Sequence, residues 1–158
     1  MIRRQFPKQE WRPNPVGQTR TIEEAIAIAR RFGVQIPDDV DFFVDEFGYL
    51  DATTTARSSR LSPRTPETPV QWSDFVASAT GKVPFLIRPD VLEIDEAIVA
   101  VIAHEMYELE ELRPLLLEGK TSIKDIIWHS RPGVPGNLHD KAWDVADTFV
   151  ERMKGEEK

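Results

Sequence analysis

The sequence predicts a mainly α-helical protein of the α+β class, with one or two short strands preceding a long central helix. Apolar residues recur at helical spacing in four separate segments of the chain. A compact apolar run at residues 82–88 is bounded by glycine and proline, which is typical of a strand. With 158 residues, of which 41% are hydrophobic, the chain is long enough for one domain with a substantial core.

The N-terminal part predicts an extended arm followed by a first helix. Residues 1–20 are rich in Arg, Gln and Pro and have no apolar period, so we expect them to form an arm. Thr21 followed by Glu24 is the pattern of a capping box, and apolar residues then repeat at helical spacing up to Gly33. The next segment, 34–50, contains a Phe-Phe-Val run, and its periodicity leaves a short helix or a pair of strands open.

Residues 51–69 predict a long, mobile surface loop. A run rich in Thr, Ser and Arg is followed there by three prolines within seven residues, which does not favour a regular element. A short helix is predicted at 71–79. The predicted strand at 82–88 contains Pro84, which favours a position at the edge of a sheet.

Residues 94–113 predict the long central helix. Stepping 100° per residue places six apolar side chains in one stripe: Ile98, Val101, Ile102, Met106, Leu109 and Leu112. Pro114 then interrupts the pattern. We therefore expect an amphipathic helix that faces the core on one side.

Two further helices are predicted after the central one. Thr121 or Ser122 can cap a short helix, and Asn137 can cap a last helix over about 138–153. The inward stripe of that last helix extends back by one turn to His139. The globular domain is thus expected to span residues 21–154.

Composition argues against several classes of partner. A net charge of -7 argues against nucleic acid and anionic membranes. No stretch reaches the roughly 18 apolar residues of a membrane span. Because there is no cysteine, a metal would have to be held by His, Asp or Glu. The chain is expected to be cytoplasmic as it stands, or to be exported as part of a larger protein.

Glu105 is the clearest functional clue, because it falls inside the apolar stripe of the central helix. A buried, ionised carboxylate costs several kcal/mol unless it is paired. His104 and Glu108 are four residues apart and so lie one turn above the other, beside the stripe. Any chemistry is therefore expected from these three residues and His139.

The segment His104-Glu105-Met106-Tyr107-Glu108, on a helix that follows a strand, resembles the His-Glu-x-x-His core of zincin-like metalloproteases. The resemblance implies that His104 is a zinc ligand and Glu105 the catalytic base, and it places Glu108 where the family has its second histidine. Zinc accepts nitrogen and carboxylate ligands together. A set of His104, Glu108 and His139 would then hold zinc or another divalent metal and leave a fourth position open.

A second resemblance covers residues 95–113 and 135–147, which look like segments of the C-terminal domains of bacterial polymorphic toxins. It implies an enzymatic effector that belongs to a larger parent protein and is neutralised by an immunity protein.

The sequence thus predicts a metal-dependent hydrolase, a toxin effector domain that cleaves peptide or related acyl bonds. One alternative is a metal-independent ribonuclease toxin, in which Glu105 and His139 act as acid and base and Arg57, Arg60 or Arg131 stabilises the phosphate.

A second alternative is a non-catalytic immunity or interaction module, in which the His-Glu group is a buried polar network. In that case Glu105 takes part in an ion pair and His104 bonds to a neighbouring carboxylate. Of the remaining ring side chains, Trp128 and Trp143 are expected in the core, and His129 is expected to be structural.

Overall fold

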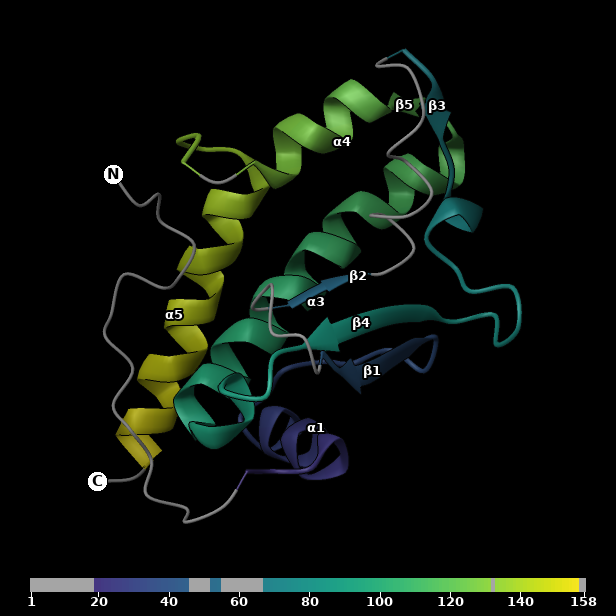
Figure 1. Ribbon diagram of the computed structural model, residues 1–158. Coiled ribbons are helices and arrows are strands. Elements are labelled where there is room, and N and C mark those ends of the chain that lie inside the picture. Colours follow the sequence, from purple (N-terminus) through teal and green to yellow (C-terminus); the bar gives the residue numbers. More distant parts are fainter. Residues whose placement is uncertain (1–18, 46–51, 55–66, 132, 157–158) are drawn as a thin grey trace.

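The computed structural model describes residues 19–45, 52–54, 67–131 and 133–156. Its centre is helix α3 (Asp95–Glu118), which lies between α5 (Leu138–Glu156) on one side and α1 (Ile22–Arg31) and a small sheet on the other (Figure 1). The predicted fold class, mainly α with short strands ahead of a long central helix, is confirmed. The predicted arm lies outside the described residues, except for its last two.

The main sheet has three strands in the order β1-β4-β2. Strands β1 (Val40–Val44) and β4 (Val83–Ile87) run parallel, whereas β2 (Ala52–Thr54) is antiparallel to β4. Alternate residues of β4 are buried, as expected for a strand with one face on the core. Strand β1 resolves the ambiguity of the segment 34–50 in favour of a strand.

Strand β4 lies in the middle of this sheet, so the predicted edge position of Pro84 is wrong. The backbone explains how proline fits there. The N–H of Val83 donates to the carbonyl of Asp39 on the β1 side, and successive residues of a strand turn their backbone groups to opposite sides. Pro84, which has no N–H, therefore turns its backbone nitrogen to the β2 side, where the described pairing covers Phe85 to Ile87.

Two further predictions for the middle of the chain are corrected by the structure. Residues 52–54 of the predicted loop 51–69 form strand β2, and their sequence Ala-Thr-Thr includes two β-branched residues suited to a sheet, while residues 55–66 lie outside the described residues. A single 3₁₀ turn, η1 (Trp72–Asp74), replaces the predicted helix at 71–79. It follows β3 (Pro69–Val70), which pairs with the distant β5 (Thr121–Ser122), a contact that local periodicity cannot reveal.

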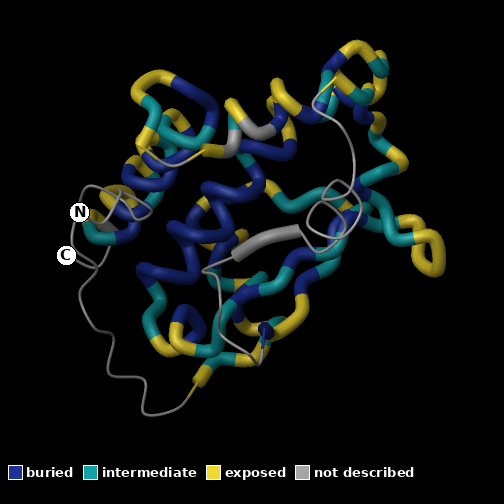
Figure 2. Tube along the Cα trace, turned by 45° about the horizontal axis from the view of Figure 1, so that its top comes forward, coloured by how far each residue is buried: buried dark blue, intermediate teal, exposed yellow. Residues whose placement is uncertain are grey.

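Helix α3 is longer and more deeply buried than predicted. Every residue from Glu96 to Met106 is buried, so this half of the helix is covered on all sides (Figure 2). The helix also continues through Pro114 to Glu118 and is capped by Gly119, whose φ is 68°. Leu116 is 1% exposed, and its burial helps to hold the turn that follows the proline.

The predicted helix starts are confirmed. Thr21 and Glu24 form the capping box of α1. Ser122 caps α4 (Ile123–Ser130), and Asn137 accepts a hydrogen bond of 2.9 Å from the N–H of Asp140. No described helix combines the length and apolar character that crossing a membrane would require.

Arg113 ties α3 to the segment before β1 and provides a test of the fold. It donates two hydrogen bonds to the Asp39 carboxylate, at 2.8 and 3.1 Å, and its guanidinium lies 4.3 Å from the centre of the Trp72 ring. These hydrogen bonds lower the pKa of Asp39 below its ordinary value of 3.8. Because the pKa is lowered in the folded state, the pair stabilises the fold above pH 3.8 and loses this effect as the pH falls below it.

Replacing Arg113 by Met is expected to lower the free energy of unfolding by about 1 kcal/mol at neutral pH, since the pair is partly exposed. Urea denaturation at neutral pH and below pH 3.8 measures both effects, and the variant should lose less stability on acidification. Lys124→Met is the control, because its ion pair with Glu67 is largely exposed. Identical acid dependence in the Arg113 variant and wild type would contradict this account.

Candidate metal centre

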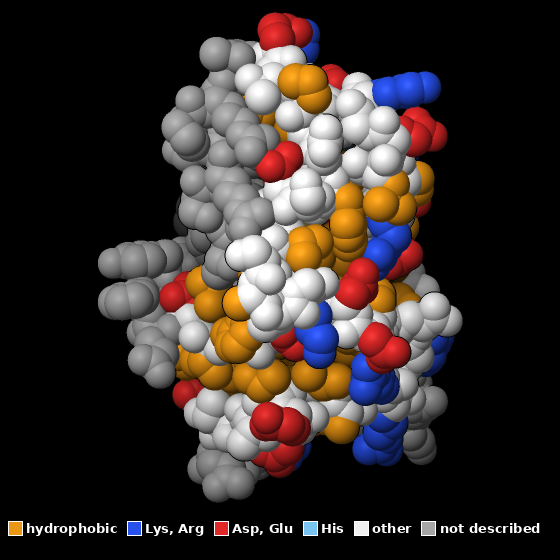
Figure 3. Space-filling model, turned by 90° about the vertical axis from the view of Figure 1, so that its right-hand side faces the viewer, with side chains coloured by type: hydrophobic (Ala, Val, Ile, Leu, Met, Phe, Trp, Pro, Cys, Tyr) orange, Lys and Arg blue, Asp and Glu red, His pale blue; other side chains and the backbone are white. Residues whose placement is uncertain are grey.

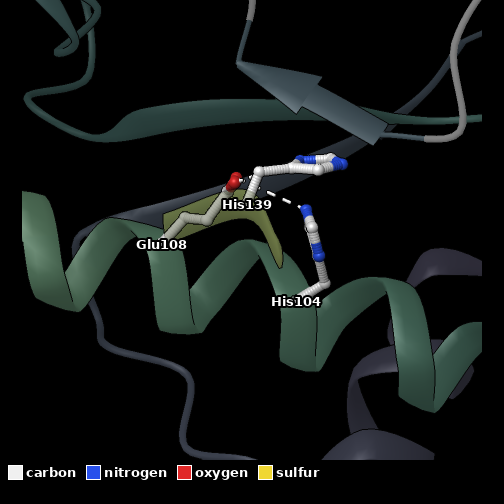
Figure 4. A group of neighbouring side chains, drawn as sticks. All are labelled: His104, Glu108 and His139. Carbon is white, nitrogen blue, oxygen red and sulfur yellow. Dashed lines mark ion pairs between the residues drawn. The ribbon is translucent and has the colours of Figure 1, made fainter. Parts of the chain in front are cut away.

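The candidate site lies where α3 and α5 pack together, and this helix pair makes the most extensive contact in the described structure. His104 and Glu108 come from successive turns of α3, and His139 comes from the first turn of α5 (Figure 4). The start of α5 therefore lies beside the middle of α3. This packing brings the three predicted ligands together, although Glu108 and His139 are 31 residues apart in the sequence.

The Glu108 carboxylate lies between the two imidazole rings. Its Oε2 is 3.5 Å from Nε2 of His104, and its Oε1 is 3.3 Å from Nδ1 of His139. One ligand atom from each residue lies within 4.8 Å of the other two. All three side chains are shielded from solvent, with exposed fractions of 3%, 6% and 13% for His104, Glu108 and His139. This group of two nitrogens and one carboxylate can hold a divalent metal ion.

Glu105 borders the same group. Its Oε1 lies 3.9 Å from Nε2 of His104, and its side chain is 8% exposed. By contrast, Glu110 and Glu111, farther along the helix, are exposed. The Tyr107 hydroxyl lies 3.3 Å from Oε1 of Glu111 and donates to it. Of the carboxylates at 105, 108, 110 and 111, only Glu105 and Glu108, the two predicted site residues, lie near His104.

Trp143 also contributes to this site, a role that the sequence did not predict. Trp143 was assigned only to the core, where it does lie, with 3% of its surface exposed. Its indole N–H also donates a hydrogen bond of 3.2 Å to Nε2 of His139, and its ring centre lies 4.0 Å from that of His104. The spacing of four residues between His139 and Trp143 was a signal that could have revealed this contact.

Other candidate residues lie elsewhere. The prediction that Trp128 is a core residue is wrong, because the side chain stands 49% exposed near the end of α4. His129 contacts the Trp128 ring edge-on and is not part of the His104, Glu108 and His139 group. For the ribonuclease alternative, Arg57 and Arg60 lie outside the described residues, and Arg131 is exposed.

Comparisons of the chain with models of protein families, with curated proteins and with solved structures find no match. Function is therefore inferred from the chemistry of the site itself.

Proposed function

We propose that this protein is a metal-dependent hydrolase in which His104, Glu108 and His139 hold one divalent cation and Glu105 acts as the catalytic base. The observation that carries the proposal is the convergence of His104, Glu108 and His139 between α3 and α5, with the Glu105 carboxylate 3.9 Å from Nε2 of His104. Two imidazoles and a carboxylate are the protein ligands of a common type of catalytic zinc site, so zinc is the first candidate.

The distances support a metal of this size. Bonds of about 2.0 to 2.1 Å around a tetrahedral zinc ion place neighbouring ligand atoms about 3.4 Å apart. Oε2 of Glu108 lies 3.5 Å from Nε2 of His104, and Oε1 lies 3.3 Å from Nδ1 of His139, so each histidine has this separation from one oxygen of the carboxylate. One ligand atom from each residue can be chosen so that no pair is more than 4.8 Å apart, and the longer separations close with shifts of at most about 1.5 Å, within reach of small side-chain rotations.

We assign Glu105 the role of base beside the open fourth position. A divalent ion held by these three residues would leave one position open for water and would lower the pKa of that water. The Glu105 carboxylate could then accept a proton and return it to the leaving group. Glu105 adjoins the ligand His104 without belonging to the ligand set, and this position suits the role of base.

The sheet suggests the class of substrate. Strand β2 is an edge strand of the described sheet, contacts α3, and passes above His139 in the view of Figure 4. An extended peptide can pair with such an edge as an additional strand, through main-chain hydrogen bonds that do not depend on its sequence. A peptide bound along β2 would lie near the metal, so we propose peptide bonds as the substrate class. That this chain is a toxin effector domain with an immunity protein stays a prediction from the sequence.

One observation favours a second, non-catalytic function. The indole of Trp143 already bonds to His139, and Glu108 lies between both histidines, so the group can form a polar network without a metal. In that case the protein would be an interaction module whose buried network fixes the packing of α3 on α5.

Chelation separates these functions. Purified protein is incubated with a library of quenched fluorescent peptides and, separately, with RNA, before and after treatment with 1,10-phenanthroline. We expect peptide cleavage that the chelator abolishes and added zinc restores. Cleavage of RNA that persists in chelator would contradict the metal-dependent mechanism, and a lack of any activity in zinc-loaded protein would favour the interaction module.

A further inference from the structure

Trp143 contacts both histidines of the candidate metal centre from within the core. Its indole N–H lies 3.2 Å from Nε2 of His139, and its ring centre lies 4.0 Å from the ring centre of His104. The helix α5 supplies both His139 and Trp143, one turn apart. Trp143 therefore helps to determine how His139 presents its two nitrogens.

The direction of this hydrogen bond fixes the arrangement of the His139 ring. An indole N–H can only donate, so Nε2 of His139 must offer its lone pair. A neutral imidazole carries one hydrogen and one lone pair, which leaves the hydrogen on Nδ1. Nδ1 lies 3.3 Å from Oε1 of Glu108, close enough for an electrostatic contact with that carboxylate. In this arrangement neither nitrogen of His139 has a lone pair available for a metal ion.

We propose that Trp143 is a positioning residue that holds His139 in a metal-free arrangement and competes with the metal ion for it. This inference rests on the proposed metal site. When a metal binds Nδ1, the hydrogen of the neutral ring moves to Nε2, and two N–H groups would then face each other. When a metal binds Nε2, it takes the lone pair that the indole uses. Either way, the hydrogen bond between Trp143 and His139 is lost as the metal binds.

Trp143→Phe tests the inference, because it keeps an apolar ring and removes the N–H. The variant is expected to bind zinc about fivefold more tightly than wild type. This factor corresponds to the net free energy of one hydrogen bond. Trp128→Phe, on the exposed part of α4, is the matched control and should bind zinc as wild type does. If Trp143 only supported the packing of the site, its replacement would loosen the ligands and weaken zinc binding.

A second readout uses the wild-type protein and does not depend on the folding of a variant. The ¹⁵N-labelled protein has four tryptophans, each with one indole N–H signal in an NMR spectrum. The signal of Trp143 is assigned by its nuclear Overhauser contacts to the two histidine rings. We expect this signal to shift strongly during a titration with zinc, while that of Trp128 stays in place.

Three results would overturn the inference. Zinc binding that leaves the Trp143 signal unmoved, or an equal or weaker affinity in folded Trp143→Phe, would refute the competition and leave the metal site intact. A wild-type protein that takes up no zinc would refute the proposed function, and the inference would fall with it. Zinc uptake by wild type therefore distinguishes the two failures.

Discussion

Glu105→Gln is expected to lower the rate of peptide hydrolysis by a factor of about 10² to 10⁴, which is the usual contribution of a general base. Glutamine has nearly the same shape, but its amide cannot accept the proton of the metal-bound water. Because Glu105 lies outside the group of three ligands, the variant should still bind one zinc ion. Initial rates on the peptide library, together with the zinc content of the same samples, measure both effects.

Glu111→Gln is the matched control for this substitution. Glu111 lies on the same helix but is exposed, so its replacement should change the rate less than twofold. A Glu105→Gln variant that keeps more than about a tenth of the wild-type rate would exclude Glu105 as the base. A variant that loses zinc together with its activity would instead assign Glu105 to the ligand set.

Glu108→Gln is expected to remove the stabilisation that zinc gives to the fold. A ligand present at 100 times its dissociation constant stabilises the native state by about 2.7 kcal/mol. For a chain of this length that raises the melting temperature by about 5 to 11 °C. Glu108 provides the only carboxylate of the ligand group, and a neutral amide is a much weaker ligand for zinc. The shift in the variant should therefore stay below about 2 °C.

Thermal unfolding with and without zinc measures this effect, and Glu110→Gln serves as the control. Glu110 lies two residues farther along α3 and is exposed, so its variant should keep the full zinc-dependent shift. An equal shift in Glu108→Gln and wild type would show that zinc binds elsewhere on the protein.

Much of the fold could be predicted from the sequence, because the signals are local. The caps at Thr21, Ser122 and Asn137 depend on residues only three positions away, and all three were predicted. The predictions that were wrong concern contacts between segments that are far apart in the sequence. Nothing in the sequence near Pro84 indicates that β2 lies on its other side, and the burial of α3 on all sides depends on elements that come before and after it.

In the candidate site too, local relations could be predicted from the sequence and contacts between distant segments could not. His104 and Glu108 are one turn apart, so periodicity alone places them together. His139 could be predicted as inward-facing, but its approach to Glu108 needs the packing of two helices. Trp143 was missed because a large aromatic residue on an inward stripe is adequately explained by the core. The indole N–H of a buried tryptophan usually has a hydrogen-bond partner, and this requirement indicates a polar neighbour for Trp143, which is His139.

The most direct test of the proposed metal centre is the metal content of protein purified without chelator, for wild type and His104→Ala side by side. Loss of a hydrogen bond that supports a metal ligand typically lowers metal affinity by about 10- to 100-fold. His104 supplies a ligand atom itself, so its loss should lower the affinity for the metal by more than that. We predict about one equivalent of zinc or another divalent metal in wild type and none in the folded variant. Absence of metal from both proteins, even after incubation with zinc, would contradict the metal centre.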